Sequence, residues 1–362
     1  MKPFLIFILN HPYLILITVL TIGLTPATGQ EVGQTERLIS PLIKDLYSAD
    51  PSAHVFDGKL YVYPSHDLDA GVTEDDLGSH FDMRDYHVYQ ISESLEATDL
   101  GEILNVNQIP WAEKQLWAPD AATKNGTYYF YFPAKDSTGI FRIGVATAST
   151  PEGPFIAEPS PIEGAVSIDP CVFVDSDGAA YMYFGGIWGG QLQRWESGSY
   201  VSEDIYPSEN QAAIMPKMAK MTEDMLAFEE APKNVLLLDH EGKPLTAGDN
   251  ERRFFEAAWV HKVNDTYYFS YSTGDTHNIS YATGTSPMGP FTYQGVILKP
   301  VLGWTNHHSI VEFNGQWYLF FHDSELSGGK THLRNVKVTP LEHLPDGSIQ
   351  TIDALVTVSQ TE

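Results

Sequence analysis

Residues 56–63 read FDGKLYVY, an Asp-Gly pair followed directly by a run of aromatic and aliphatic residues. Similar stretches follow as KNGTYYFY at 124–131, SDGAAYMY at 176–183, VNDTYYFS at 263–270 and FNGQWYLF at 313–320. Asn-Gly and Asp-Gly between strand-like runs are a strong hairpin signal, because both central residues of a tight turn then tolerate positive φ. The repeat therefore predicts five β-hairpins spread along the chain.

Further strands follow most of these hairpins and make the repeat larger. Two of them end in nearly the same turn, STPEGPF at 149–155 and TSPMGPF at 285–291. Whole units of several strands that recur at about 40 to 50 residues are typical of propeller blades. Five copies predict an all-β fold, a five-bladed β-propeller. A β-sandwich with repetitive hairpins is the alternative.

The interval between the third and fourth hairpins is longer than the others. It predicts an insertion within residues 189–250, with some helical content such as residues 211–225.

The first residues differ in composition from the rest of the chain. Lys2 is followed by a nearly continuous apolar run at 4–24 and by small residues at 27–29. This pattern predicts a secretory signal peptide over residues 1–29, with a single propeller domain over residues 30–362 and a secreted or periplasmic protein. Because the apolar run is long for a signal peptide, a retained membrane anchor is the alternative. Once the signal is removed, no membrane association is expected.

The net charge limits the classes of binding partner, and the cysteine content decides whether a disulfide is possible. The formal net charge of −26 argues against nucleic acid and anionic membranes, and it is compatible with an uncharged substrate. Cys171 is the one cysteine, so an intrachain disulfide is excluded. We expect Cys171 to be a buried strand residue.

Three acidic residues occupy matching places in the repeat. Asp50, Asp169 and Glu256 each stand eight or nine residues before the turn of a hairpin. A single Asp-Pro pair is most simply a turn at the start of a strand. Three carboxylates that converge at one end of a propeller axis are costly to bury, and this favours a functional role. Cleavage of a glycosidic bond requires a protonated carboxyl beside an ionised one, and a third acid can tune the pKa of the proton donor.

These motifs resemble glycoside hydrolase family 43. The sequences DPS at 50–52, IDP at 168–170 and FEAA at 255–258 are similar to the three acidic motifs of that family. The resemblance covers nearly all of the chain after its N-terminal segment. It implies an inverting mechanism in which Asp50 is the general base, Glu256 is the general acid, and Asp169 tunes the pKa of the acid. Inversion places base and acid roughly 6.5 to 9.5 Å apart.

The resemblance also implies substrate-binding residues and an ion. Trp117, in WAPD at 117–120, is similar to a tryptophan of the sugar-binding wall, and Arg334 to an arginine that binds a sugar hydroxyl. The alternatives are a core tryptophan and an arginine on a strand face paired with a carboxylate. His307 is similar to a histidine that lies under the site and contacts an axial calcium through water. His308 would point to the opposite face of the strand, so a two-histidine zinc site is not expected there.

The calcium is expected to be structural, and no organic cofactor is implied. The family acts mostly on β-D-xylosides, α-L-arabinofuranosides and arabinan. Long segments at 68–86 and 189–250 are expected to close one side of the channel mouth, which favours exo-cleavage. We therefore expect release of xylose from β-xylo-oligosaccharides with α-L-arabinofuranosidase side activity, and xylo- and arabino-oligosaccharides as partners.

An endo-arabinanase and a non-catalytic sugar-binding propeller are the alternatives, and the oligomeric state stays open. Residues 67–71 are interpreted as a solvated loop.

Overall fold

The computed structural model describes residues 35–36 and 39–357. The chain divides into a unit spanning Glu36–Val356 and a set of terminal residues, Met1–Thr35 with Thr357–Glu362. The signal peptide expected at residues 1–29 lies outside the described residues. Within the described part of the chain, no helix is long and apolar enough to cross a membrane.

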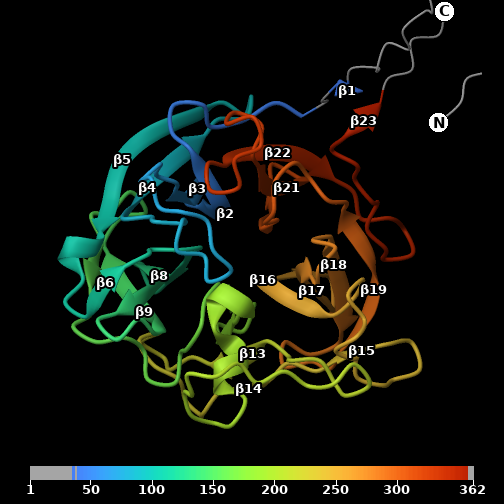
Figure 1. Cartoon of the computed structure of the whole chain (residues 1–362). Coiled ribbons are helices and arrows are strands. Elements are labelled where there is room, and N and C mark those ends of the chain that lie inside the picture. The colour runs from blue at the N-terminus through green and yellow to red at the C-terminus, as the bar shows by residue number, and fades with distance from the viewer. Residues whose placement is uncertain (1–34, 37–38, 358–362) are drawn as a thin grey trace, which may run out of the picture. The chain divides into compact units, whose positions relative to one another are not determined.

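The unit Glu36–Val356 is a five-bladed β-propeller, as the repeat predicts (Figure 1). The first blade is a four-stranded antiparallel sheet made of β2 (Ser48–Phe56), β3 (Lys59–His66), β4 (Asp85–Ile91) and β5 (Ala97–Asn105). The second blade consists of β6 (Ala112–Lys114), β7 (Asp120–Lys124), β8 (Thr127–Asp136), β9 (Phe141–Ala148) and β10 (Ile156–Ala157).

The other three blades follow in chain order. The third contains β11 (Cys171–Val174), β12 (Ala180–Phe184), β13 (Lys217–Lys220) and β14 (Lys233–Asn234). The fourth contains β15 (Leu237–Leu238), β16 (Phe254–Val263), β17 (Thr266–Thr273), β18 (Ile279–Gly284) and β19 (Phe291–Leu298). The fifth contains β20 (His308–Phe313), β21 (Gln316–Asp323) and β22 (Asn335–Leu341). Two further short strands are β1 (Thr35–Glu36) and β23 (Val356–Thr357).

The first strand of each hairpin surrounds the central axis. In chain order β2, β7, β11, β16 and β20 each contact the next, and β20 contacts β2, so the inner ring is continuous. Buried aromatic and aliphatic side chains fill the spaces between neighbouring blades. Asp120 joins three blades at the axis, since its carboxylate accepts hydrogen bonds from the Ser52 hydroxyl and the Val172 backbone N–H.

Residues before β2 and at its start close the ring against the fifth blade. The Leu42 N–H donates to the Val336 carbonyl and the Ser48 N–H to the Arg334 carbonyl. The segment after β22 packs on the fourth blade instead, where the Ile352 N–H donates to Ile297. The N-terminal segment, and not the segment after β22, therefore pairs with the fifth blade.

The hairpin turns have the backbone that their sequences predict. Asp57 and Gly58 have φ of 50° and 75°, and Asn125 and Gly126 have φ of 54° and 79°, so both central residues are left-handed. Cys171 is buried at the start of β11, as expected.

The expected helix at residues 211–225 is wrong. That segment contains β13, which pairs with β12, and the helical turns nearby are the 3₁₀ turns η2 (Trp188–Gly190) and η3 (Leu192–Trp195). A third such turn, η1 (Val106–Gln108), follows β5. Buried methionines at 215, 218, 221 and 225 imitate helical spacing, yet they pack between blades because the backbone between them pairs with a neighbouring strand.

Candidate active site

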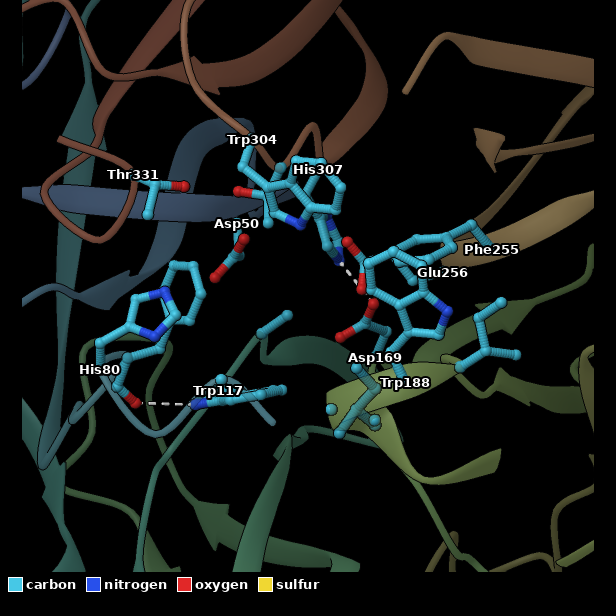
Figure 2. A pocket seen from close by; sticks show the side chains of 18 of the residues that line it. Asp50, His80, Trp117, Asp169, Trp188, Phe255, Glu256, Trp304, His307 and Thr331 are labelled. Carbon is cyan, nitrogen blue, oxygen red and sulfur yellow. Dashed lines mark hydrogen bonds and ion pairs between the residues drawn. The ribbon is translucent and has the colours of Figure 1, made fainter. Parts of the chain in front are cut away.

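The three acidic residues lie where the inner strands begin, on distorted backbone. Asp50 and Asp169 have φ of 50° and 56°, and Ala257, directly after Glu256, has φ of 62°. The register of strand pairing shifts between Ala49 and Ser52 in β2 and on both sides of Glu256 in β16. Bulges redirect side chains and occur often beside active sites. Here they accompany Asp50 and Glu256, which face a single cavity together with Asp169 (Figure 2).

This cavity lies at one end of the axis and has a volume of about 490 Å³. Asp50, Asp169 and Glu256 line it together with residues from all five blades. The segment between β3 and β4 supplies one wall, including His80 and Phe81. The cavity has the size of a small-molecule site and combines apolar walls with a few convergent polar groups.

Hydrogen-bond donors surround the Asp50 carboxylate. The Ser65 hydroxyl donates to Oδ2 at 2.6 Å, and Nη1 of Arg334 donates to Oδ1 at 3.0 Å. Burial by itself would raise the pKa of Asp50, but the charge of Arg334 and the other neighbouring groups outweigh it and lower the pKa to about 2. Asp50 is therefore an ionised base at neutral pH.

Glu256 has the opposite environment. Burial, followed by the nearby charge of Asp50, raises the pKa of Glu256 to about 8. Burial and the neighbouring Glu256 also raise the pKa of Asp169 well above its usual range. The Ala257 N–H donates to Oδ2 of Asp169 at 2.8 Å, so Asp169 holds the backbone directly after Glu256. A carboxyl that keeps its proton at neutral pH is suited to act as a general acid.

Two buried histidines lie beside the acidic residues, His322 against Asp50 and His307 against Asp169. The Asp50 N–H donates to Nδ1 of His322 at 3.0 Å, so Nε2 of His322 carries the proton and points to Thr305. Burial and the charge of Arg334 lower the pKa of His322 to about 3, which keeps its ring neutral. His307 lines the cavity with Nε2 3.7 Å from Oδ2 of Asp169 (Figure 2).

Comparison with known families and proteins shows which family the chain belongs to. The family model described as "Glycosyl hydrolases family 43" matches residues 43–349. The chain belongs to glycosyl hydrolase family 43. As a family 43 member, it is a glycosidase.

Curated family 43 relatives are similar over most of this chain. A xylosidase/arabinosidase of Bacteroides ovatus is 56% identical over 86% of this chain and 97% of its own length. Xylosidase/arabinosidase 43A of Humicola insolens is 58% identical over 86% and 99%.

A solved family 43 structure is also similar, a β-xylosidase/α-arabinofuranosidase from a compost microbial metagenome. It holds xylotriose in a calcium-free form and is 61% identical. Its TM-score is 0.86, over 89% of this chain and 99% of that one.

The remaining residues expected from the family 43 motifs also reach the cavity. Trp117 lines it half-buried, and its indole N–H donates to the Phe81 carbonyl at 2.9 Å. Arg334 also lines the cavity. Its guanidinium is paired with two carboxylates, so the alternative interpretation, an arginine paired with a carboxylate, describes its contacts within the protein. Of the two long segments expected to wall the mouth, the one between β3 and β4 does so. Within residues 189–250, which the structure describes throughout, only Gly189 and Gly190 reach the cavity.

Asp67 was missed by the interpretation of residues 67–71 as a solvated loop, which is wrong for this residue. Its side chain is buried, and its two oxygens accept hydrogen bonds from Nε and Nη2 of Arg334 at 2.8 and 2.7 Å. Its partner is far away in the sequence, so no local pattern shows the pair.

Two tryptophans at the mouth of the cavity were also missed. The rings of Trp188 and Trp304 stack with centroids 5.6 Å apart, and Trp304 is 42% exposed (Figure 2). Both lie outside the repeated strands, and the only feature of the sequence that could have indicated them is that they are tryptophans.

Proposed function

We propose that this chain is an inverting exo-glycosidase that releases xylose from β-xylo-oligosaccharides, with α-L-arabinofuranosidase side activity. The observation that carries the proposal is the contrast between Asp50 and Glu256. One is an ionised carboxylate held by Arg334 and Ser65, and the other has a pKa raised to about 8 in the same cavity. That contrast is what a base and an acid on the two sides of a glycosidic bond require.

In the proposed mechanism, Asp50 accepts a proton from a water molecule whose oxygen attacks the anomeric carbon. The bond from that carbon to the glycosidic oxygen breaks, and Glu256 donates its proton to the leaving oxygen. Attack on the face opposite the leaving group inverts the anomeric configuration. Because Asp169 binds the Ala257 N–H, we assign it the task of positioning Glu256. Because its carboxyl interacts electrostatically with Glu256, we also assign it the task of tuning the pKa of that acid.

Several features support the choice of sugar and of exo-cleavage. The relatives described above carry names for xylose and arabinose release, and the similar solved structure holds xylotriose. The wall between β3 and β4 covers one side of the cavity. We assign the aromatic faces of Trp117, Trp188 and Trp304 to packing against sugar rings, and Arg334 and His307 to binding sugar hydroxyls.

We further propose that calcium binds in the central channel as a structural ion. Both ring nitrogens of His307 are buried and, among the described residues, lack a hydrogen-bond partner. Calcium prefers oxygen ligands, so a hydrated ion that reaches His307 through water fits better than a directly bound one. The ion would supply positive charge near the site, while the proton transfers belong to the carboxylates. Chelation should lower the melting temperature; an unchanged melting temperature and activity would contradict the proposal.

We propose secretion from the sequence at residues 1–29. N-terminal sequencing of the mature protein from culture medium or periplasm checks this proposal.

The first experiment compares monosaccharide release from xylobiose and from an α-L-arabinofuranoside, using the wild type and Glu256→Gln. Xylose should appear from xylobiose, and the variant should lose about 10²- to 10⁴-fold in kcat, the usual contribution of general acid catalysis. Nuclear magnetic resonance of the first product should show inverted anomeric configuration.

Other outcomes would change the assignment. Release of arabinose alone would overturn the choice of sugar but leave the mechanism. Cleavage of linear arabinan alone would indicate an endo-arabinanase. If no substrate is cleaved, and the variant binds sugar as the wild type does, the chain is a sugar-binding propeller.

A further inference from the structure

A second cluster of potential ligands lies on the first blade, outside the cavity. It consists of His66 at the end of β3 and of Asp85 and His87 in β4. One ligand atom from each lies within 4.8 Å of the others. In the part of the chain that the structure describes, it is the one group of three or more histidine, cysteine or acidic side chains that meets this condition. The proposed catalytic steps do not use any of its members.

The strands of the blade build this cluster from rigid positions. Asp85 and His87 are two residues apart in β4, and alternate residues of a strand share a face. The β4–β5 ladder slips on both sides of His87, between Tyr86 and His87 and between His87 and Tyr89. Such irregularities re-aim a side chain and are found next to functional sites. The placement of His87 is therefore a specific feature of this blade.

The contacts within the cluster bring the imidazoles and carboxylates together. Nδ1 of His66 is 2.6 Å from Oδ1 of Asp85, and the two imidazole rings meet edge to face with centroids 5.5 Å apart. A second carboxylate, Asp99 in β5, lies 3.0 Å from Nδ1 of His87. The side chains of His66, Asp85 and His87 are 16–18% exposed, so an ion could reach them from solvent.

Two imidazoles and one carboxylate suit a particular class of ion. Nitrogen and carboxylate donors are the ligands of Zn²⁺ and of similar transition metals, whereas calcium requires six to eight oxygens. A carboxylate that holds one ring nitrogen of a ligating histidine is a common feature of such sites, and Asp99 contacts Nδ1 of His87. We propose that His66, Asp85 and His87 bind one divalent transition-metal ion of the Zn²⁺ class, with water completing its coordination.

The position of this site gives the ion a structural task. His66 directly precedes Asp67, and Asp85 directly follows Arg84, so the site joins both ends of the segment 67–84. That segment supplies the wall of the catalytic cavity that includes His80 and Phe81. An ion bound at the site would hold together the two strands from which this wall projects.

The test measures binding of zinc chloride to the chelator-treated full chain by titration calorimetry and by thermal melting. The wild type should bind one zinc ion at the blade-one site, and its melting temperature should rise with zinc concentration, because an ion that binds only the folded state stabilises it. Asp85→Asn and His87→Gln should each weaken that binding by at least about tenfold, and Asp99→Asn by about 10- to 100-fold.

Two further variants separate the outcomes. His240→Gln removes an exposed histidine from a distant turn and should bind zinc as the wild type does. His307→Gln should retain zinc binding, since His307 belongs to the catalytic channel. Absence of zinc binding to the wild type would overturn the proposal, as would blade-one variants that bind zinc as tightly as the wild type. Loss of binding in His307→Gln would place the ion in the channel and also overturn it. Circular dichroism of the zinc-free variants checks that they are folded.

Discussion

At the scale of single residues, Arg334 links two buried carboxylates. Asp67 accepts hydrogen bonds from Nε and Nη2 of its guanidinium, and Asp50 accepts one from Nη1. The Arg334 backbone N–H also donates to Asp67 at 2.8 Å. Asp67 thus fixes both the backbone and the side chain of the arginine that keeps Asp50 ionised, although Asp67 does not belong to the lining of the cavity.

We expect Asp67→Asn to lower kcat by about 10- to 100-fold, since small misplacements of a catalytic group have effects of this size. The variant removes one carboxylate charge from Arg334 and loosens its hold on Asp50. Its melting temperature should also fall, because breaking a buried ion pair is destabilising. Steady-state kinetics below the melting transition measure the effect, with substrate KM compared separately from kcat.

The matched control is Asp69→Asn, which changes an exposed carboxylate two residues away that pairs with Lys330. It should keep the wild-type kcat. A folded Asp67→Asn protein with unchanged kcat would show that Asp67 does not position Arg334.

At the scale of elements, the segment after β12 supports the strand that carries Glu256. A Cβ added at Gly186 would lie 2.6 Å from Cδ1 of Ile168 and 3.2 Å from Cβ of Glu256. The backbone at Gly186 has little freedom to move, because its N–H and carbonyl are both hydrogen-bonded to the hydroxyl of Ser167. A side chain at this position therefore requires Ile168 to move and presses against Glu256.

Gly186→Ala should displace Glu256 and lower kcat by about tenfold or more. It should also destabilise the fold by about 1 to 3 kcal/mol, the usual cost of overpacking. Gly295→Ala in β19 is the control, because its added Cβ meets only Tyr281 at an ordinary 3.7 Å. Equal kcat and melting temperature for the two variants would disprove the tight contact at Gly186.

At the scale of the whole molecule, the propeller buries neutral histidines near its axis and between its blades. Burial lowers the pKa of His261 and His308 well below the usual value and that of His322 to about 3. In the unfolded chain these side chains regain a pKa of about 6.5. Below that pH the unfolded state therefore binds protons that the folded state does not.

Stability should consequently be highest above pH 6.5 and should fall as the pH drops toward 3. Each such histidine removes about 1.4 kcal/mol of unfolding free energy per pH unit between its two pKa values. Glu256 and Asp169, whose pKa values are raised, act in the opposite direction, but the buried histidines outnumber them. Melting temperatures measured from pH 7.5 to 5 test whether the histidines outweigh the two acids. A melting temperature that stays constant or rises as the pH falls would refute this expectation.

Local sequence patterns were sufficient to predict the repeating unit and the places of the three carboxylates. Hairpin turns and strand alternation depend on neighbouring residues, so they are visible in a single chain, and Asp50, Asp169 and Glu256 stand at one register of that repeat. The family motifs added Trp117, Arg334 and His307, all of which line the cavity.

The way in which those residues are held depends on contacts between distant parts of the chain. Asp67 and Arg334 are 267 positions apart, and Asp50 and His322 are 272 apart, so no local pattern connects them. The segment 211–225 contains the strand β13 because β12 offers backbone hydrogen bonds that the segment's own apolar spacing does not reveal. The pKa contrast between Asp50 and Glu256 likewise depends on burial and on a distant guanidinium. The desolvation of a carboxyl and its interaction with a charged group depend on distances in space, and closure of the ring sets those distances.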